Sequence, residues 1–234
     1  TAEVGEGGKT DAAQTAAPKF EWGKHPRVLV VGGGASHDFN RWFNQADLAI
    51  LSGKNSVNYT EDVSQIEPAL KEIDVLYLSN NQPLTSGGRN AVMGFANSGR
   101  PLLLVHPALW YNWKEWPEYN RELVGGGARG HEKYGEFEVE VNAADHPLMK
   151  GVPKTFRISD ELYQHVPDPS GTPIEILATG KSLVTGKTYP VVWITKHPKT
   201  KIVCITLGHD GAAHDLPAFK SILQNSVDWL ANKN

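Results

Sequence analysis

Short apolar runs in the first half of the chain alternate with segments of helical periodicity. The runs are nearly continuous and end in glycine or polar residues, which is typical of strands buried on both faces of a parallel sheet. Candidate strands lie at 27–32, 57–60, 74–80 and 101–106. Candidate helices lie at 38–48, 64–73 and 85–99. Ser64 and Glu67 have capping-box spacing at the start of the second helix, and Thr85 is the expected N-cap of the third.

The second half of the chain has a different pattern of apolar and polar residues. Residues 137–141 alternate between apolar and polar, 174–178 are apolar, and 191–195 are expected to pair with 202–207 across a turn at 197–200. The chain closes with a predicted amphipathic helix at 215–232. Together the two halves predict an α/β fold with three layers: a mostly parallel sheet, helices on both of its faces with right-handed crossovers, and added antiparallel strands in the C-terminal half.

Composition is that of an ordinary globular protein, and it excludes several classes. Of 234 residues, 40% are hydrophobic and the net charge is −3, without a Lys/Arg run that would bind nucleic acid. No apolar stretch is long enough to span a bilayer. Cys204 lies in an apolar run, where a buried, inert thiol is expected. Residues 1–19 are predicted to be a disordered leader and residues 20–234 a single domain. Such a leader slightly favours a periplasmic or secreted protein over a cytoplasmic one.

Polar residues follow several of the predicted strands. Because ligands of open α/β sheets bind beyond the carboxyl ends of the strands, these residues form the candidate site, here called the rim. They are His37 and Asp38 after the first strand, His106 after the fourth, Asp160 and Glu161 after 156–159, and His209 and Asp210 after the last. For each residue alone, a role as a helix cap or turn residue is about as probable as a role in a site. The occurrence of all of them at one edge of the sheet favours a site.

Two chemistries suit a rim of this composition. His37, His106 and His209 can bind a divalent metal such as zinc, or they can act with the carboxylates as general acids and bases without a metal. The sequence does not choose between them, because no HExxH spacing is present. A dinucleotide fingerprint starting at Gly32 fails, since its third glycine would have to be residue 37. No Gly-x-Ser-x-Gly nucleophile elbow exists either, which argues against acyl-enzyme chemistry.

An aromatic segment and a glycine-rich loop follow His106. Residues 110–119 include three tryptophans, and Trp110 is the one nearest the rim. Aromatic faces of this kind suit the C–H faces of sugar rings, while core packing or a subunit contact in a homo-oligomer explains them about as well. The loop at 125–131 is expected to be flexible and to bring His131 over the rim as a lid, although a plain surface loop is an equal alternative.

These segments, in this order and spacing, resemble the ThuA family, which is named for trehalose utilisation. The resemblance covers roughly residues 28–230 and rests on the motifs GASHDF at 34–39, LVHPA at 104–108, Gly125-Gly126 followed by His131, HPL at 146–148 with Gly151, DELY at 160–163, PVVW at 190–193 and LGHD at 207–210. It implies a flavodoxin-like core akin to class I glutamine amidotransferases, with His106 where those enzymes carry a nucleophilic cysteine. Pro107 departs from the small residue that is more usual in the family at this position, and the turn at 196–201 is an addition.

The resemblance implies carbohydrate, and in particular disaccharide, metabolism. Our first hypothesis is an enzyme that acts on a keto-glycoside by acid–base or metal-assisted chemistry on the carbons next to the carbonyl. The rim histidines and Asp160 or Glu161 would act as acid, base, orienting group or metal ligands. Residues expected to contact the substrate are Asp38, Trp110, His131, Tyr163 and Asp210. The alternative is a non-catalytic carbohydrate-binding or regulatory protein; amide hydrolysis is disfavoured because the elbow lacks a nucleophile.

Overall fold

The computed structural model describes residues 20–232. The leader predicted at 1–19 lies outside the described residues. Among the residues that are described, no helix is both long and apolar enough to cross a membrane.

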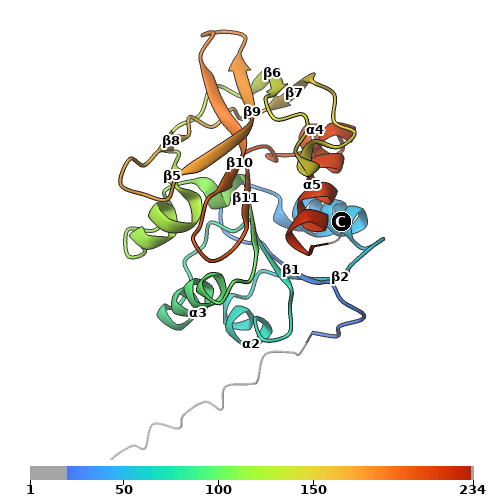
Figure 1. The fold of residues 1–234 in the computed structure, drawn as a ribbon, viewed down its shortest axis with the longest axis vertical. Helices are drawn as coiled ribbons and strands as arrows, with labels where there is room; N and C mark the ends of the chain where they lie inside the picture. Colours follow the sequence, from blue (N-terminus) through green and yellow to red (C-terminus); the bar gives the residue numbers. More distant parts are fainter. Residues whose placement is uncertain (1–19, 233–234) are drawn as a thin grey trace, which may run out of the picture.

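A nine-stranded mixed sheet forms the centre of the fold (Figure 1). Its parallel part consists of β2 (Ser56–Thr60), β1 (Arg27–Val31), β3 (Val75–Leu78), β4 (Leu102–Val105) and β11 (Ile202–Ile205), in that order. The sheet continues with antiparallel strands β10 (Thr188–Thr195), β9 (Ile174–Ser182), β6 (Gly135–Val141) and β7 (Thr155–Asp160). The predicted change from parallel to antiparallel pairing is confirmed, and it falls between β11 and β10.

Helices cover both faces of the sheet, as the alternation of elements predicted. One face carries the π-helix η1 (Asn40–Ala46), α1 (Asp47–Leu51) and α5 (Pro217–Leu230), and the other carries α2 (Ile66–Ala69), α3 (Ser86–Asn97) and the π-helix η4 (Tyr119–Val124). Successive residues of a parallel strand supply the two cores: Val30 packs against the first group and Leu29 against the second. Shorter helical segments are η2 (Val63–Gln65), η3 (His106–Leu109), η5 (Pro147–Met149) and α4 (Gly211–His214).

The early helices differ in detail from the sequence expectation. The helix predicted at 38–48 begins as the π-helix η1 and continues into α1. The second helix is capped by Asp62, whose side chain accepts a hydrogen bond from the Ser64 backbone N–H, and it ends at Ala69. Ser64 therefore does not cap this helix, because the preceding carboxylate already occupies that role. Thr85 caps α3 as predicted.

The antiparallel strands bring the end of β7 back to the rim. Three strands separate β7 from β11 in the sheet order, and each neighbouring pair is antiparallel. Four reversals of direction return β7 to the direction of β11, so both carboxyl ends point to the same edge of the sheet. Asp160 at the end of β7 accepts hydrogen bonds from the backbone N–H groups of Gly208 and His209, which follow β11.

The segment at 125–131 is held by backbone pairing. Gly126–Gly127 form β5 and pair with β8 (Val166–Pro167), while isolated bridges join Trp110 to Ala128 and His131 to Tyr163. The first four residues of the segment are buried. The structure thus shows a paired inner segment in place of the flexible loop expected from its glycines.

Candidate functional site

Loops from four strand ends meet at one point of the rim. They place His37 after β1, His106 after β4, Glu161 after β7 and His209 after β11. Each side chain presents one donor atom, and the four donor atoms lie within 4.8 Å of one another. These four residues, here called the histidine–glutamate cluster, could hold a divalent metal ion, as could any close group of imidazoles and a carboxylate. All four are among the residues that the sequence singled out.

His106 stands at the elbow between β4 and the helical turn η3. Its φ of 45° lies in the left-handed region that side chains other than glycine rarely adopt. A strained strand-to-helix turn of this kind lifts the side chain above the end of the sheet, as in nucleophile elbows. The ring is fully buried, and its Nδ1 atom lies 2.5 Å from the Thr206 carbonyl oxygen. Cys204, in contrast, is buried inside β11, and burial raises the pKa of its thiol to about 12.

Glu161 is the centre of the cluster. Its Oε1 atom lies 3.3 Å from His106 Nε2 and 2.8 Å from His209 Nδ1, and its Oε2 atom lies 3.0 Å from His131 Nε2. One carboxylate therefore contacts three imidazole rings. His37 completes the arrangement, with its ring centroid 5.0 Å from that of His106 and 4.9 Å from that of His209.

Burial and mutual contact shift the pKa values of these groups in different directions. Burial lowers the pKa of His37 to about 4, and repulsion by His106 adds to this effect. Burial alone would raise the pKa of Glu161, but the interactions with His106 and His209 outweigh it and hold the pKa well below its usual range. The Glu161 carboxylate raises the pKa of His209 against the effect of burial. Shifts of pKa in opposite directions among neighbouring groups are typical of functional sites.

Asp160 lies directly beneath the cluster. It is fully buried and accepts backbone N–H groups from Glu161, Gly208 and His209 at 2.8, 2.8 and 3.1 Å. Burial is the main cause of its raised pKa. Through these bonds Asp160 fixes the backbone that carries Glu161 and His209, so the structure places it as a support of the site.

A cavity of about 300 Å³ opens next to the cluster. Trp110 and Tyr163 form an aromatic wall, and their ring centroids lie 5.2 Å apart in an edge-to-face arrangement. The Tyr163 ring also stacks on His106 at 4.3 Å. His131 reaches the cavity and Glu161, as the sequence suggested. The cavity is lined by Ser36, His37, Asn81, Pro107, Trp110, Asn112, His131, Glu161 and Tyr163.

Two predicted substrate-contacting residues do not line this cavity. Asp38 accepts a hydrogen bond from the Arg41 backbone N–H, and Asp210 caps α4 through the Ala212 N–H while accepting the Tyr134 hydroxyl. Both are thus explained as caps at helix starts. The aromatic segment at 110–119 serves two roles: Trp113 is buried in the core, and among its aromatic residues only Trp110 lines this cavity.

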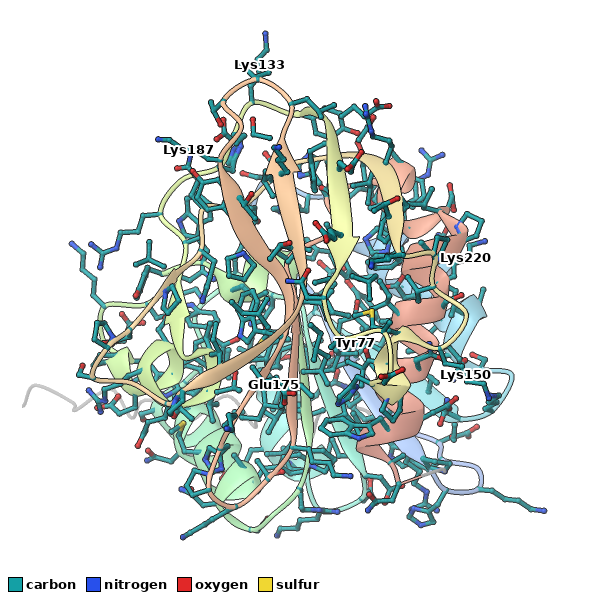
Figure 2. The ribbon with its side chains drawn as sticks, turned by 45° about the horizontal axis from the view of Figure 1, so that its top comes forward. Tyr77, Lys133, Lys150, Glu175, Lys187 and Lys220 are labelled. Carbon is teal, nitrogen blue, oxygen red and sulfur yellow. The ribbon has the colours of Figure 1, made fainter. Side chains whose placement is uncertain are left out.

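A series of buried, hydrogen-bonded polar side chains next to the cluster was not predicted from the sequence. His214 Nδ1 lies 2.6 Å from Asp47 Oδ1, the Tyr77 hydroxyl donates to Asp47 Oδ2 at 2.6 Å, and all three side chains are fully buried. Figure 2 labels Tyr77 among the side chains in the middle of the molecule. The second ring nitrogen, Nε2 of His214, lies 2.8 Å from the Gly208 carbonyl oxygen, next to His209. One sequence signal could have indicated this buried group. Asp47 follows Phe43 by four residues, which places a carboxylate on the apolar face of the helical segment formed by η1 and α1.

Comparison with known sequences decides the family. The sequence model of the ThuA family, described as trehalose utilisation, matches residues 27–230. The chain belongs to the ThuA family. This confirms the resemblance that the sequence motifs indicated. None of the curated proteins matches the chain.

Solved structures confirm the fold. A ThuA-like protein from Parabacteroides merdae has a TM-score of 0.78 at 20% identity, covering 90% of this chain and 91% of its own. A ThuA-like protein from Bacteroides uniformis has a TM-score of 0.73 at 21% identity, covering 92% and 95%. A glutamine amidotransferase from Thermotoga maritima, 11% identical, has a TM-score of 0.57 and covers 89% and 99%. The flavodoxin-like architecture related to class I amidotransferases is therefore confirmed.

Proposed function

We propose that this ThuA-family protein is an enzyme of carbohydrate metabolism that acts on a keto-glycoside, most simply a 3-keto derivative of trehalose or a related disaccharide. The single observation that carries the proposal is the convergence of Glu161 and its histidines at an aromatic-walled cavity on the rim. The family's association with trehalose utilisation supports the choice of substrate class. Trp110, packed edge-to-face against Tyr163, supplies an apolar face of the kind on which sugar rings stack.

The proposed chemistry begins with removal of a proton from the carbon next to the sugar's carbonyl. The electron pair of that C–H bond forms a double bond to the carbonyl carbon, and the π pair of the C=O bond moves onto the oxygen, which becomes a negatively charged enediolate oxygen. Groups that stabilise this charge where it develops provide much of the rate enhancement. His37 and Glu161 of the histidine–glutamate cluster line the cavity, and this side of the cavity is the proposed position of the oxygen.

His131 is the proposed proton acceptor. Its side chain is 35% exposed, whereas His106 is fully buried, so His131 is accessible to a substrate in the cavity. Its Nδ1 atom lies 2.7 Å from the Glu132 carbonyl oxygen, which only accepts hydrogen bonds, so Nδ1 carries the hydrogen and Nε2 is the basic atom. Nε2 faces Glu161 at 3.0 Å, and the carboxylate stabilises the imidazolium that forms when the proton arrives.

The test is hydrogen exchange at the carbons next to the carbonyl. The purified chain is incubated with 3-keto-trehalose in D2O and the loss of the C–H signals is followed by NMR, together with product formation. We expect exchange well above the protein-free rate, and a loss of about 100-fold or more in Glu161→Gln and in His131→Asn. Glu136→Gln is the matched control, because Glu136 lies on β6 and pairs with Arg157 at the surface.

Absence of both exchange and turnover across a panel of keto-disaccharides would contradict the proposal. Sugar binding without exchange would instead support the alternative, a carbohydrate-binding protein on the same fold.

A further inference from the structure

The hydrogen bonds of two cluster histidines fix which ring nitrogens face the cluster. His37 Nδ1 lies 3.0 Å from the Ala35 carbonyl oxygen, and His106 Nδ1 lies 2.5 Å from the Thr206 carbonyl oxygen. A carbonyl oxygen only accepts hydrogen bonds, so each Nδ1 atom carries the hydrogen. In the neutral rings, both Nε2 atoms therefore present lone pairs to the cluster. A backbone carbonyl that holds the far nitrogen in this way is the usual support of a metal-binding histidine.

Electron-rich atoms meet in the cluster without enough hydrogens between them. His106 Nε2 lies 3.3 Å from Glu161 Oε1, and with the neutral ring both atoms are acceptors. His37 Nε2 is buried and has no hydrogen-bond partner. His209 Nδ1 lies 2.8 Å from Glu161 Oε1, so two imidazole nitrogens approach this one oxygen. Unpartnered buried nitrogens are costly, and a cation placed between these atoms would satisfy all of them at once.

The spacing of the four donor atoms is close to that of a metal shell. They lie within 4.8 Å of one another. Around a tetrahedral ion with bonds of about 2.1 Å, ligand atoms are about 3.4 Å apart. Side-chain rotations that move each donor atom by about 1 Å would close the shell. The backbone is already set for this closure, because Asp160 holds the backbone N–H groups of Glu161 and His209.

The donor set selects the class of ion. Three imidazole nitrogens and one carboxylate oxygen suit zinc and its neighbours in the first transition row, whereas calcium and magnesium prefer shells built of oxygen. The cavity borders two of the donor residues, His37 and Glu161, and leaves a side of the cluster from which a sugar oxygen can approach. With four protein donors, a sugar oxygen would be the fifth ligand, a coordination number to which catalytic zinc sites can expand.

We propose that His37, His106, Glu161 and His209 bind one divalent transition-metal ion of the zinc class, with a further coordination position open toward the cavity. Glu161 would coordinate through Oε1 and keep its contact between Oε2 and His131. The inference deepens the proposed function, because a bound ion would be the group that stabilises the enediolate oxygen. Metal binding by the chain can be measured independently of turnover.

The experiment measures metal binding directly. The chain is stripped with a chelator, dialysed and titrated with Zn²⁺ by calorimetry and with Co²⁺ by visible absorption. We expect one ion per chain, and d–d bands of Co²⁺ whose intensity reports four- or five-fold coordination. His37→Ala, Glu161→Gln and His209→Ala should each weaken binding by at least 100-fold. His197→Ala is the matched control, since His197 lies in the turn between β10 and β11, away from the rim.

Far-UV circular dichroism and urea unfolding of each variant separate lost binding from lost folding. Glu161→Gln preserves the shape of the side chain, and it keeps the test valid if an alanine variant does not fold. Failure of the native chain to take up one Zn²⁺ or Co²⁺, or uptake undiminished in a folded Glu161→Gln variant, would overturn the metal site. Turnover of a keto-sugar by a chain that binds no metal would overturn this inference alone, whereas stoichiometric metal without turnover would leave it standing and remove the proposed function.

Discussion

His214 and Asp47 form a fully buried pair, with 2.6 Å between Nδ1 and Oδ1, although 167 residues separate them in the chain. The pair joins α4 to α1, and through His214 Nε2 it reaches the Gly208 carbonyl oxygen beside His209. Buried ion pairs of this kind stabilise little relative to an apolar pair, but they are costly to break because one charge is left without a partner.

We expect His214→Ala to lower the free energy of unfolding by about 3 kcal/mol or more, because it leaves the Asp47 carboxylate buried without its main partner. Tyr77→Phe is the matched comparison. It removes one hydrogen bond to the same carboxylate and should cost about 2 kcal/mol. Urea unfolding of both variants checks the order. A smaller loss for His214→Ala than for Tyr77→Phe would show that the ion pair does not hold the carboxylate.

The same pair should make stability depend on pH. Burial opposes protonation of His214, but the Asp47 carboxylate outweighs it and raises the pKa of the folded protein's imidazole. A raised pKa stabilises the fold fully below the unfolded value of about 6.5, and this contribution is lost as the pH rises through the folded value. The difference in free energy of unfolding between the native chain and His214→Gln should therefore be larger at pH 6 than at pH 9. His209 also has a raised pKa, but it is present in both proteins and its contribution cancels. A difference that stays constant would contradict the prediction.

The turn after β1 should not tolerate a side chain at Gly34. This residue has a φ of +126°, and a Cβ atom there would lie 1.8 Å from the Asn81 amide oxygen. Asn81 uses that oxygen to accept the Ala35 N–H, which holds the turn that carries His37. We expect Gly34→Ala to cost about 1–3 kcal/mol and to weaken any activity of the rim. Gly53→Ala is the control, because nothing lies within 4 Å of its added Cβ. Equal stabilities of the two variants would be the contrary result.

Cys204 should play no part in the chemistry. Its thiol is fully buried in β11, 3.5 Å from the Thr195 hydroxyl, and its pKa is raised to about 12. We expect a thiol reagent such as DTNB to react only as fast as the protein unfolds, and Cys204→Ala to retain activity on whatever substrate the native chain converts. Loss of activity in a stably folded Cys204→Ala would reopen amidotransferase-like catalysis.

Trp110 should contribute to sugar binding more than to catalysis. Its ring forms the wall of the cavity with Tyr163, and its indole N–H only donates hydrogen bonds, so it cannot accept the substrate's proton. Removing one stacking surface should raise KM by about tenfold and leave kcat within a few-fold. Trp22→Ala is the control, since Trp22 donates to Glu72 near the opposite edge of the sheet. A Trp110→Ala variant with unchanged KM would show that the sugar does not stack there.

Local patterns were sufficient to predict the parallel half of the fold. Continuous apolar runs at β1, β3 and β4, each followed by a helical segment, leave few arrangements other than a sheet covered on both faces. The rule that carboxyl ends share one edge then brings His37, His106 and His209 together. The ends of the second helix are harder to predict, because they depend on single hydrogen bonds such as the one by which Asp62 caps it.

The amino-acid sequence by itself thus determined the layers of the fold and most members of the rim, because hydrophobic periodicity and strand order act through near neighbours. Tertiary structure decided how those members act. The four reversals that return β7 to the rim place Glu161 among the histidines, and Asp160 beneath it on the backbone of Gly208. The tautomers of His37 and His106 depend on carbonyl oxygens that reach them only in the folded chain. The Asp47–His214 pair joins residues 167 positions apart, a distance over which no local pattern carries information.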